Sequence, residues 1–393
     1  MEHICDFHIH SRYSRACSKE ITIKNLVKYA KIKGVDVLGT GDFTHPKWLE
    51  ELKHSFVKEQ DGIYYTEDNF PFIFQTEISL MSYNHKIHLV MLAPSLEIVE
   101  QINSELMKKG RLDYDGRPIF GMSPVEFVDS MMNISKDIEI FPAHIWTPWF
   151  GMFGSKSGWD SIKECFQESI RYIHAYETGL SSDPPMNWRV SQLDKFTTLS
   201  NSDSHSFWPW RLGREATIFN LNKLSFYEII QKIRNNDSKN IATIEIDPKM
   251  GKYHFDGHRN CNICFSPEET KKHNGICPVC GRELTIGVEA RVEQLADRPF
   301  GYVLPGRRFE KLLPLSELIA HSLGKGVATK AVFQLYFKLI KGFGNEFNIL
   351  RKADISKIKI LGGEKLSQLI DDNRNNKIRI RPGYDGNYGS ILN

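Results

Sequence analysis

The segment HICDFHIH, residues 3–10, decides the fold, because it is a short apolar run of β type that carries two histidines at its end. Alternation along a strand places His8 and His10 on one face, about 6.6 Å apart along the chain. Strand propensity gives no reason for imidazoles at these positions. The end of this strand is therefore a candidate chemical site.

Six more runs of β type follow within the first 225 residues. They cover residues 35–42, 71–77, 86–92, 139–144, 172–178 and 197–205. Helical patterns lie between several of them, for example over residues 23–33, which stop at Gly34. Another helix is expected over residues 124–132, after the capping residue Ser123. Alternating β and α segments predict an α/β fold.

Each of these strands carries a metal-ligating side chain, in most cases near its end. The candidates are His8, His10, Asp42, His45, Glu77, His88, His144, Glu177, Asp203 and His205. In barrel-type α/β folds the strand ends meet at one rim, where sites are built. Imidazole and carboxylate ligands in this mixture suit Zn, Mn or Fe.

So many ligands exceed the needs of one ion. Two or three divalent ions (Zn, Mn or Mg), bridged by Glu77, are expected. Clustered divalent ions suit phosphate hydrolysis, in which they activate water and hold the phosphoryl oxygens. Within this centre we expect His10, Glu77 and Asp203 to carry the catalysis.

A second motif consists of two CxxC pairs, formed by Cys261, Cys264, Cys277 and Cys280. Four thiolates at this spacing predict a closed structural zinc site. The surrounding segment is too small for a hydrophobic core of its own, so the metal would hold it together. His254, His258 and His273 lie close in sequence and are competing ligands, which we do not expect to bind.

The composition excludes several classes of protein. The chain has 393 residues, of which 41% are hydrophobic and 25% charged, and this excludes wholesale disorder. Its length predicts more than one domain, which we place at residues 1–240, 241–297 and 298–393. The sequence has no run of 18 apolar residues and its start lacks a secretory pattern, so we expect a cytoplasmic protein without a membrane partner, and a monomer.

Charge is unevenly distributed along the chain. Residues 301–393 contain 16 Lys and Arg against 8 Asp and Glu, a net charge of +8. The other residues carry a net charge of −5. A basic, helical C-terminal segment favours a polyanionic partner, and Lys338 and Lys341 are candidate phosphate contacts.

Aromatic and basic side chains cluster in the segments that follow His144 and Asp203. Aromatic faces beside cations suit unstacked bases next to phosphates. With the two lysines above, the predicted substrate-binding residues are Trp146, Trp149, Phe150, Lys156, Glu177, Trp208, Arg211, Lys338 and Lys341.

Together, the HxH of residues 8–10, the TGD of residues 40–42, Glu77 and the DxH of residues 203–205 resemble the polymerase and histidinol phosphatase (PHP) family. The resemblance implies a distorted (β/α)7 barrel with three metal ions. One ion would be shared by His8, His10, Glu77 and Asp203. A second would be held by Glu77, His88 and His144, and a third by Asp42 or His45 together with His205.

Longer stretches resemble one group within that family, the DNA repair nucleases called endonuclease Q. They are TGDFTHP (40–46), FPAHIWTPWFG (141–151), YETGLSSDPPMNWR (176–189), SDSHSFWPWRLGREAT (202–217) and PGYDGNYG (382–389). The resemblance implies a PHP barrel, a zinc ribbon with four cysteine ligands and a small DNA-binding helical domain. It also implies cleavage 5′ to a flipped-out deaminated base (uracil, hypoxanthine) or to an abasic site.

Damaged DNA would then be the main partner, with replication or repair proteins as further ones. Two alternatives stay open. One is a PHP-type phosphatase that acts on a small phosphomonoester, although a ribbon and a basic tail have little use there. The other is a nucleic-acid-binding module whose barrel has lost its activity.

Overall fold

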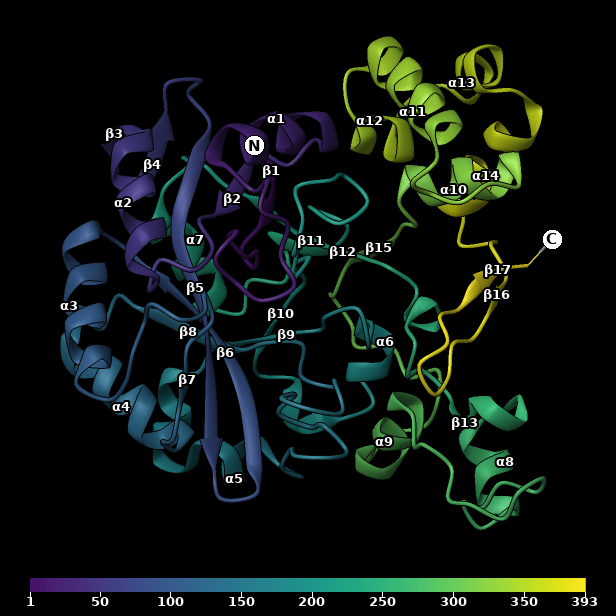
Figure 1. Ribbon diagram of the computed structural model, residues 1–393, viewed down its shortest axis with the longest axis horizontal. Helices are drawn as coiled ribbons and strands as arrows, with labels where there is room; N and C mark the ends of the chain where they lie inside the picture. The colour runs from purple at the N-terminus through teal and green to yellow at the C-terminus, as the bar shows by residue number, and fades with distance from the viewer. Residues whose placement is uncertain (393) are drawn as a thin grey trace.

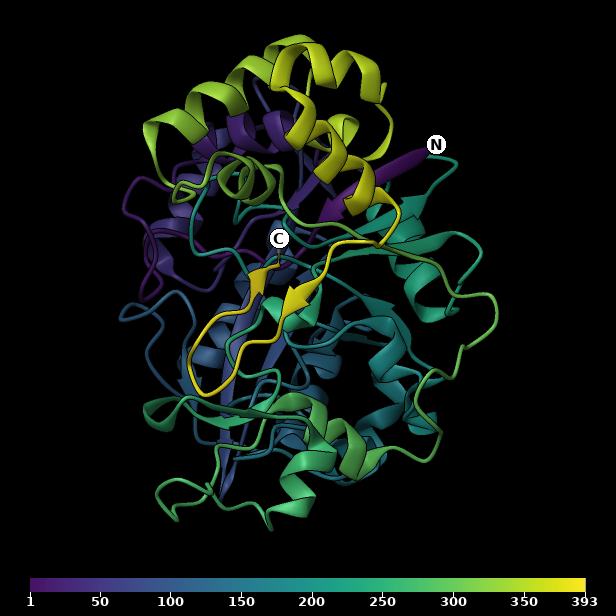
Figure 2. The same ribbon diagram turned by 90° about the vertical axis from the view of Figure 1, so that its right-hand side faces the viewer.

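The chain folds into a barrel, a small ribbon and a helical domain (Figure 1). The structure, a computed structural model, describes residues 1–392. The barrel contains the N-terminal part of the chain, the helical domain lies at the upper right of Figure 1, and the ribbon lies below it. A C-terminal hairpin runs between the helical domain and the ribbon, as Figure 2 also shows.

The barrel wall is a ring of the seven strands that the sequence predicts. In ring order they are β1 (Glu2–Asp6), β2 (Val37–Gly39), β5 (Pro71–Ser82), β6 (His85–Ala93), β8 (Glu139–Pro142), β9 (Ala175–Glu177) and β10 (Thr197–Leu199). β1, β2 and β5 are parallel, whereas β6 runs antiparallel to both β5 and β8. Isolated bridges from Ile140 to Ile173 and from Ile9 to Ser204 complete the ring. The predicted α/β barrel is therefore confirmed. It departs from a regular parallel barrel at β6, which runs in the opposite direction to its neighbours.

Further strands extend the sheet on either side of the ring. They are β3 (Phe56–Gln60), β4 (Ile63–Thr66), β7 (Ile119–Phe120), β11 (Ala216–Asn220), β12 (Ile241–Glu245) and β15 (Phe309–Lys311). β11 pairs antiparallel with β1, β12 with β11, and β15 lies parallel to β12. The barrel sheet thus continues past the predicted domain boundary at residue 240 and takes up a strand from beyond residue 298.

Helices cover the barrel wall. They are α1 (Ile23–Lys33), α2 (Pro46–Ser55), α3 (Leu96–Met107), α4 (Pro124–Ile134), α5 (Ile162–Phe166), α6 (Pro184–Asn187) and α7 (Phe226–Arg234). The expected cap residues are in place: the side chain of Ser123 accepts the backbone N–H of Glu126, and α1 ends at Gly34, whose φ is +93°.

The inside of the barrel is apolar at one end and polar at the other. Alternate strand residues form an apolar cluster, and Phe226 of α7 packs into it. Along β5 the same inward-facing row passes from Ile73 in this cluster to Glu77. In β6 the order is reversed, because His88 precedes Val90, which belongs to the cluster. The antiparallel direction of β6 therefore brings His88 to the same rim as Glu77.

The C-terminal third contains the ribbon, the helical domain and the hairpin. The ribbon elements are β13 (Asp256–His258), β14 (Ile263–Phe265), α8 (Pro267–Lys272) and α9 (Val288–Leu295). The helical domain consists of α10 (Leu315–Leu323), α11 (Lys330–Phe343), α12 (Glu346–Arg351), α13 (Ile355–Gly362) and α14 (Glu364–Arg374). The hairpin is formed by β16 (Ile380–Arg381) and β17 (Ser390–Ile391).

A buried ion pair joins the helical domain to the barrel. The Lys33 ammonium lies 2.7 Å from Glu346 Oε1 and also donates to the carbonyl of Pro209. Neither charged side chain is more than 1% exposed. The other oxygen of Glu346 accepts the hydroxyl of Tyr336. One hydrophobic cluster contains residues of both the barrel and the helical domain, so the two pack as one body.

Across residues 1–392 no helix is both long enough and apolar enough to cross a bilayer.

Candidate metal centre

Four predicted ligands meet at the polar rim of the barrel. Ligand atoms of His8, His10, Glu77 and Asp203 all lie within 4.8 Å of one another. His10 Nε2 lies 3.1 Å from Asp203 Oδ1 and 3.3 Å from Glu77 Oε2. His8 Nε2 lies 3.5 Å from Glu77 Oε1. Donors at such spacings can share one cation.

A second group of ligands shares the same glutamate and lies around its Oε1 atom. His88 Nδ1 lies 2.9 Å and His144 Nε2 lies 3.1 Å from Glu77 Oε1. The two imidazole nitrogens are 3.2 Å apart. Glu77, which is fully buried, thus belongs to both groups, as a carboxylate that bridges two ions would.

Two buried carboxylates orient the histidines of the first group. His8 Nδ1 lies 3.0 Å from both oxygens of Glu177, and His10 Nδ1 lies 3.0 Å from Asp42 Oδ1. A carboxylate that accepts the Nδ1 proton leaves the lone pair of Nε2 free for a metal. Glu177 is fully buried and is thus placed to hold a ligand, rather than to contact substrate as the sequence suggested.

The predicted third group is not assembled in the part of the chain that the structure describes. Asp42 contacts His10 Nδ1 through Oδ1, and its Oδ2 accepts the backbone N–H of Ser11. The ring of His45 stacks on Tyr13 at 4.3 Å. His205 lies at the rim, with Nδ1 3.5 Å from Asp203 Oδ1.

The site contains an arginine that the sequence did not reveal. Arg117 Nη1 lies 3.0 Å from Glu77 Oε2, and the side chain keeps 24% of its surface exposed. Its backbone N–H is held by Asp115. The loop before β7 offers neither a motif nor a strand end, so no signal in the sequence singled Arg117 out.

The electrostatics keep the central carboxylates ionised. Burial raises the pKa of Glu77, but its contacts with the His88 ring, the Arg117 guanidinium and His8 outweigh burial and hold that pKa well below its usual range. Burial also raises the pKa of Asp203. The hydrogen bond from His10 and the neighbouring imidazoles lower it by more, so the pKa of Asp203 lies below its usual range. Burial lowers the pKa of His88 to about 4, so this ligand is neutral.

Three residues of the site also have a strained backbone. Asp42, His144 and Asp203 have φ values of +41°, +29° and +45°, a region that non-glycine residues rarely adopt. A Cβ on Gly179 would lie 2.4 Å from the Cβ of His144, so a glycine is required beside this ligand. Strain of this kind persists where a site needs one fixed geometry.

The donor set suits divalent cations. His8 Nε2 is fully buried, and no residue between 1 and 392 gives it a hydrogen bond. A buried nitrogen without a partner is costly unless a cation uses its lone pair. Divalent metal binding at the rim is therefore supported by the chemistry of the donors.

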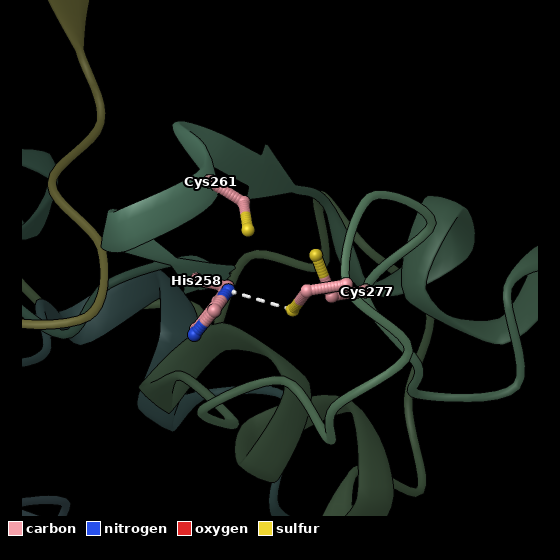
Figure 3. A group of neighbouring side chains, drawn as sticks. His258, Cys261 and Cys277 are labelled. Carbon is pink, nitrogen blue, oxygen red and sulfur yellow. Dashed lines mark hydrogen bonds between the residues drawn. The ribbon is translucent and has the colours of Figure 1, made fainter.

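The ribbon contains a separate group of ligands (Figure 3). Ligand atoms of His258, Cys261, Cys277 and Cys280 lie within 4.8 Å of one another, and Cys280 Sγ is 3.4 Å from His258 Nδ1. Burial raises the pKa of Cys277, but backbone N–H groups of Cys280 and Val279 lower it to about 6, which favours a thiolate. His258 stands where the sequence suggested Cys264, which lies outside this group of ligands, in β14 opposite Gly257.

The aromatic residues predicted to bind substrate have different environments. Trp146 is buried and donates to Asn187, so it is part of the core. Phe150 lies 4.4 Å from the ring of His88, and Trp149 is 48% exposed. Trp208 packs 5.3 Å from Phe333 of α11 and thus joins the barrel to the helical domain.

The basic residues predicted to bind substrate are exposed, namely Lys156, Arg211, Lys338 and Lys341. The Lys338 ammonium donates to the carbonyl of Leu361, which leaves Lys341 as the freer of the two α11 lysines for a phosphate.

Comparisons with known proteins agree with this picture. A family model described as the MJ0043 C-terminal domain matches residues 314–377. The uncharacterized protein MJ0043 of Methanocaldococcus jannaschii is 35% identical over 73% of this chain, which spans only 35% of that protein. The uncharacterized protein YqxK of Bacillus subtilis is 28% identical over 95% of this chain and 93% of its own length.

Two solved structures match the whole fold. The crystal structure of the lesion-specific endonuclease PfuEndoQ from Pyrococcus furiosus has a TM-score of 0.90 at 32% identity, covering 100% of this chain and 95% of its own. A complex of endonuclease Q with a 27-mer duplex substrate, with an abasic lesion at the active site, has a TM-score of 0.88 at 31% identity and covers 100% and 96%.

Proposed function

The chain belongs to the endonuclease Q family, and on this premise we propose that it is a metal-dependent DNA repair endonuclease that nicks damaged duplexes. The bond hydrolysed is the phosphodiester 5′ to a deaminated base, uracil or hypoxanthine, or to an abasic site. The damaged nucleotide leaves the helix before cleavage, which costs least where pairing is weak or a base is missing.

The observation that carries the proposal is the position of Glu77 between two sets of ligands. Glu77 Oε2 lies 3.3 Å from His10 Nε2, and Glu77 Oε1 lies 2.9 Å from His88 Nδ1. This is the arrangement that a bridged pair of ions needs. Divalent ions held there would activate water and neutralise charge on the phosphoryl oxygens.

The protein's own residues prepare the site for this chemistry. Glu177 and Asp42 fix the rings of His8 and His10, so that both Nε2 atoms face the centre. Arg117 supplies a permanent cation at the rim. With divalent ions bound to Glu77, the guanidinium would be available to donate to a non-bridging oxygen of the cleaved phosphate.

DNA would contact the barrel rim and the basic helical domain together. Phe150 and Trp149 lie at the rim, and Lys341 is exposed on α11. Phosphate contacts position a duplex without reading its sequence, which suits an enzyme that recognises damage rather than sequence.

The test uses end-labelled duplexes that contain uracil, hypoxanthine, an abasic site or no lesion, with added Mn, Zn or Mg. We expect a nick on the 5′ side of each lesion and none in the undamaged duplex. Asp203→Asn is expected to abolish cleavage and keep binding, whereas the exposed control Asp68→Asn keeps both. Cleavage by Asp203→Asn would contradict the assignment of the metal centre.

The same assay separates the alternatives. Turnover of p-nitrophenyl phosphate without nicking would favour a small-molecule phosphatase. Binding to DNA without any cleavage would favour a binding module. We further predict that the ribbon binds zinc, that the enzyme is monomeric and cytoplasmic, and that it contacts replication or repair proteins.

A further inference from the structure

The C-terminal hairpin is bound to the segment that leads into the ribbon. Gly383 N donates to Lys249 O, Gly389 N to Met250 O and Gly386 N to Lys252 O, at 2.8–3.1 Å. A Cβ on Gly389 would lie 2.0 Å from Lys249 O, so this close approach requires glycine. Figure 2 shows the hairpin across the face of the molecule, between the helical domain and the ribbon.

The hairpin completes a cluster of aromatic and basic side chains that we call the aromatic platform, formed by Trp149, Lys252, Tyr253 and Tyr388. The rings of Trp149 and Tyr253 lie 5.9 Å apart. The Lys252 ammonium is 5.6 Å from the ring of Tyr253 and 5.9 Å from that of Tyr388. The four side chains come from three segments that are far apart in the sequence.

The platform is open to solvent. Tyr388 is 68% exposed and Trp149 is 48% exposed. Large aromatic side chains that gather in the open around a cation are typical of a binding surface rather than of a core.

The platform is continuous with the metal centre. Trp149 is followed by Phe150, whose ring is 4.4 Å from that of the proposed ligand His88. The Lys86 ammonium lies 5.7 Å from the ring of Phe150. Neighbouring aromatic and basic side chains therefore extend from the metal centre at His88 to Tyr388 on the hairpin.

We propose that the aromatic platform stacks an unpaired nucleobase of the DNA beside the cleaved phosphodiester. Exposed rings stack on a base of any identity, and the ammonium of Lys252 adds attraction to a neighbouring phosphate. The inference rests on the proposed function and deepens it. An abasic lesion presents no base at the centre, so binding that relies on a neighbouring base serves every lesion alike.

The first test compares variants of Tyr388, because an exposed side chain can be changed without damage to the core. Tyr388→Leu is expected to raise the KM for an abasic duplex about tenfold and leave kcat at saturating DNA unchanged, since the variant loses the aromatic face on which the base stacks. Tyr388→Phe keeps the aromatic face and should keep the KM. Tyr83→Ala, at a fully exposed tyrosine of the β5–β6 turn, is the matched control.

A second test locates the base directly. A duplex carrying 5-iododeoxyuridine next to the abasic site is cross-linked to the Asp203→Asn variant, and the adduct is mapped by mass spectrometry. An adduct on Trp149, Tyr253 or Tyr388 is expected. Adducts elsewhere, together with an unchanged KM for Tyr388→Leu, would overturn the platform while lesion nicking stands. An adduct on the platform without nicking by the unmodified enzyme would uphold the platform and refute the proposed function.

Discussion

Arg117 Nη1 and Glu77 Oε2 lie 3.0 Å apart, so a fixed positive charge contacts the one carboxylate that both ligand groups share. Arginine stays protonated at any physiological pH. The pair therefore places an anion-binding group beside the candidate metal ligands, and the charge of this group does not change with pH in the physiological range.

Replacement of Arg117 tests its role in catalysis. Arg117→Met is expected to lower the single-turnover rate roughly 100-fold, the usual effect of losing one donor to the transition state. The metal content should stay the same, because the guanidinium is no ligand. Arg111→Met serves as the control, since Arg111 lies in the same loop but pairs with Asp113 at the surface. Equal rates in the two variants would remove Arg117 from the chemistry.

The contact between Glu177 and His8 Nδ1 predicts that Glu177 increases the metal affinity of the first ligand group. Glu177→Gln is expected to weaken binding at the first group about 10- to 100-fold, because the imidazole loses its charged acceptor. Equilibrium competition with a chelator measures this change. Glu139→Gln is matched to it, since Glu139 is equally buried and holds His174 at 3.0 Å outside the centre. A similar loss of affinity in both variants would point to general loosening of the barrel.

Metal binding should strengthen as the pH rises. Burial lowers the pKa of His8 and His10, but the negative charges of Glu177 and Glu77 around His8, and of Asp42 at His10, outweigh it and raise both pKa values. The metal-free centre thus retains protons that an incoming ion must displace. We expect affinity to increase up to about tenfold per pH unit for each proton displaced, between pH 6 and 8. A flat affinity profile in chelator competition would contradict this.

The ribbon offers a direct comparison of two ligand sets. His258→Ala and Cys261→Ser are expected to lose one equivalent of zinc and lower the Tm, because a small segment depends on its metal. Cys264→Ser should keep the zinc, since Cys264 lies outside the group. The opposite result, loss with Cys264→Ser and retention with His258→Ala, would restore the four-cysteine site. Elemental analysis and thermal melting provide both readouts.

Much of the barrel could be predicted from the sequence, because apolar β-type runs and helix caps are local signals. The helix Ile23–Lys33 begins and ends where the pattern places it. The antiparallel course of β6 could not be predicted, because strand direction depends on pairing with distant segments. β11 was missed for the same reason: its partner β1 lies some two hundred residues earlier.

The sequence likewise predicted part of the candidate site, namely its ligands, but not the roles of the residues around them. Residue type and strand position pointed to the ligands, and the structure gathers His10, Glu77 and Asp203. The positions of Asp42 and Glu177 behind the histidines depend on which nitrogen each ring presents, and no pattern records that. In the ribbon the sequence predicted Cys264, and not His258, as the fourth ligand, whereas the structure groups His258 with the other three thiols. The CxxC spacing does not determine which side chains turn toward one another.

The buried contact between Lys33 and Glu346 limits what the family model for residues 314–377 can mean. Cut away from the barrel, that stretch would lose the cationic partner of Glu346, and the apolar side chains that pack against the barrel would face water. The stretch that the family model matches therefore depends on the barrel for part of its burial. We therefore expect the helical domain, when it is produced without the barrel, to unfold at a lower temperature than it does in the full chain.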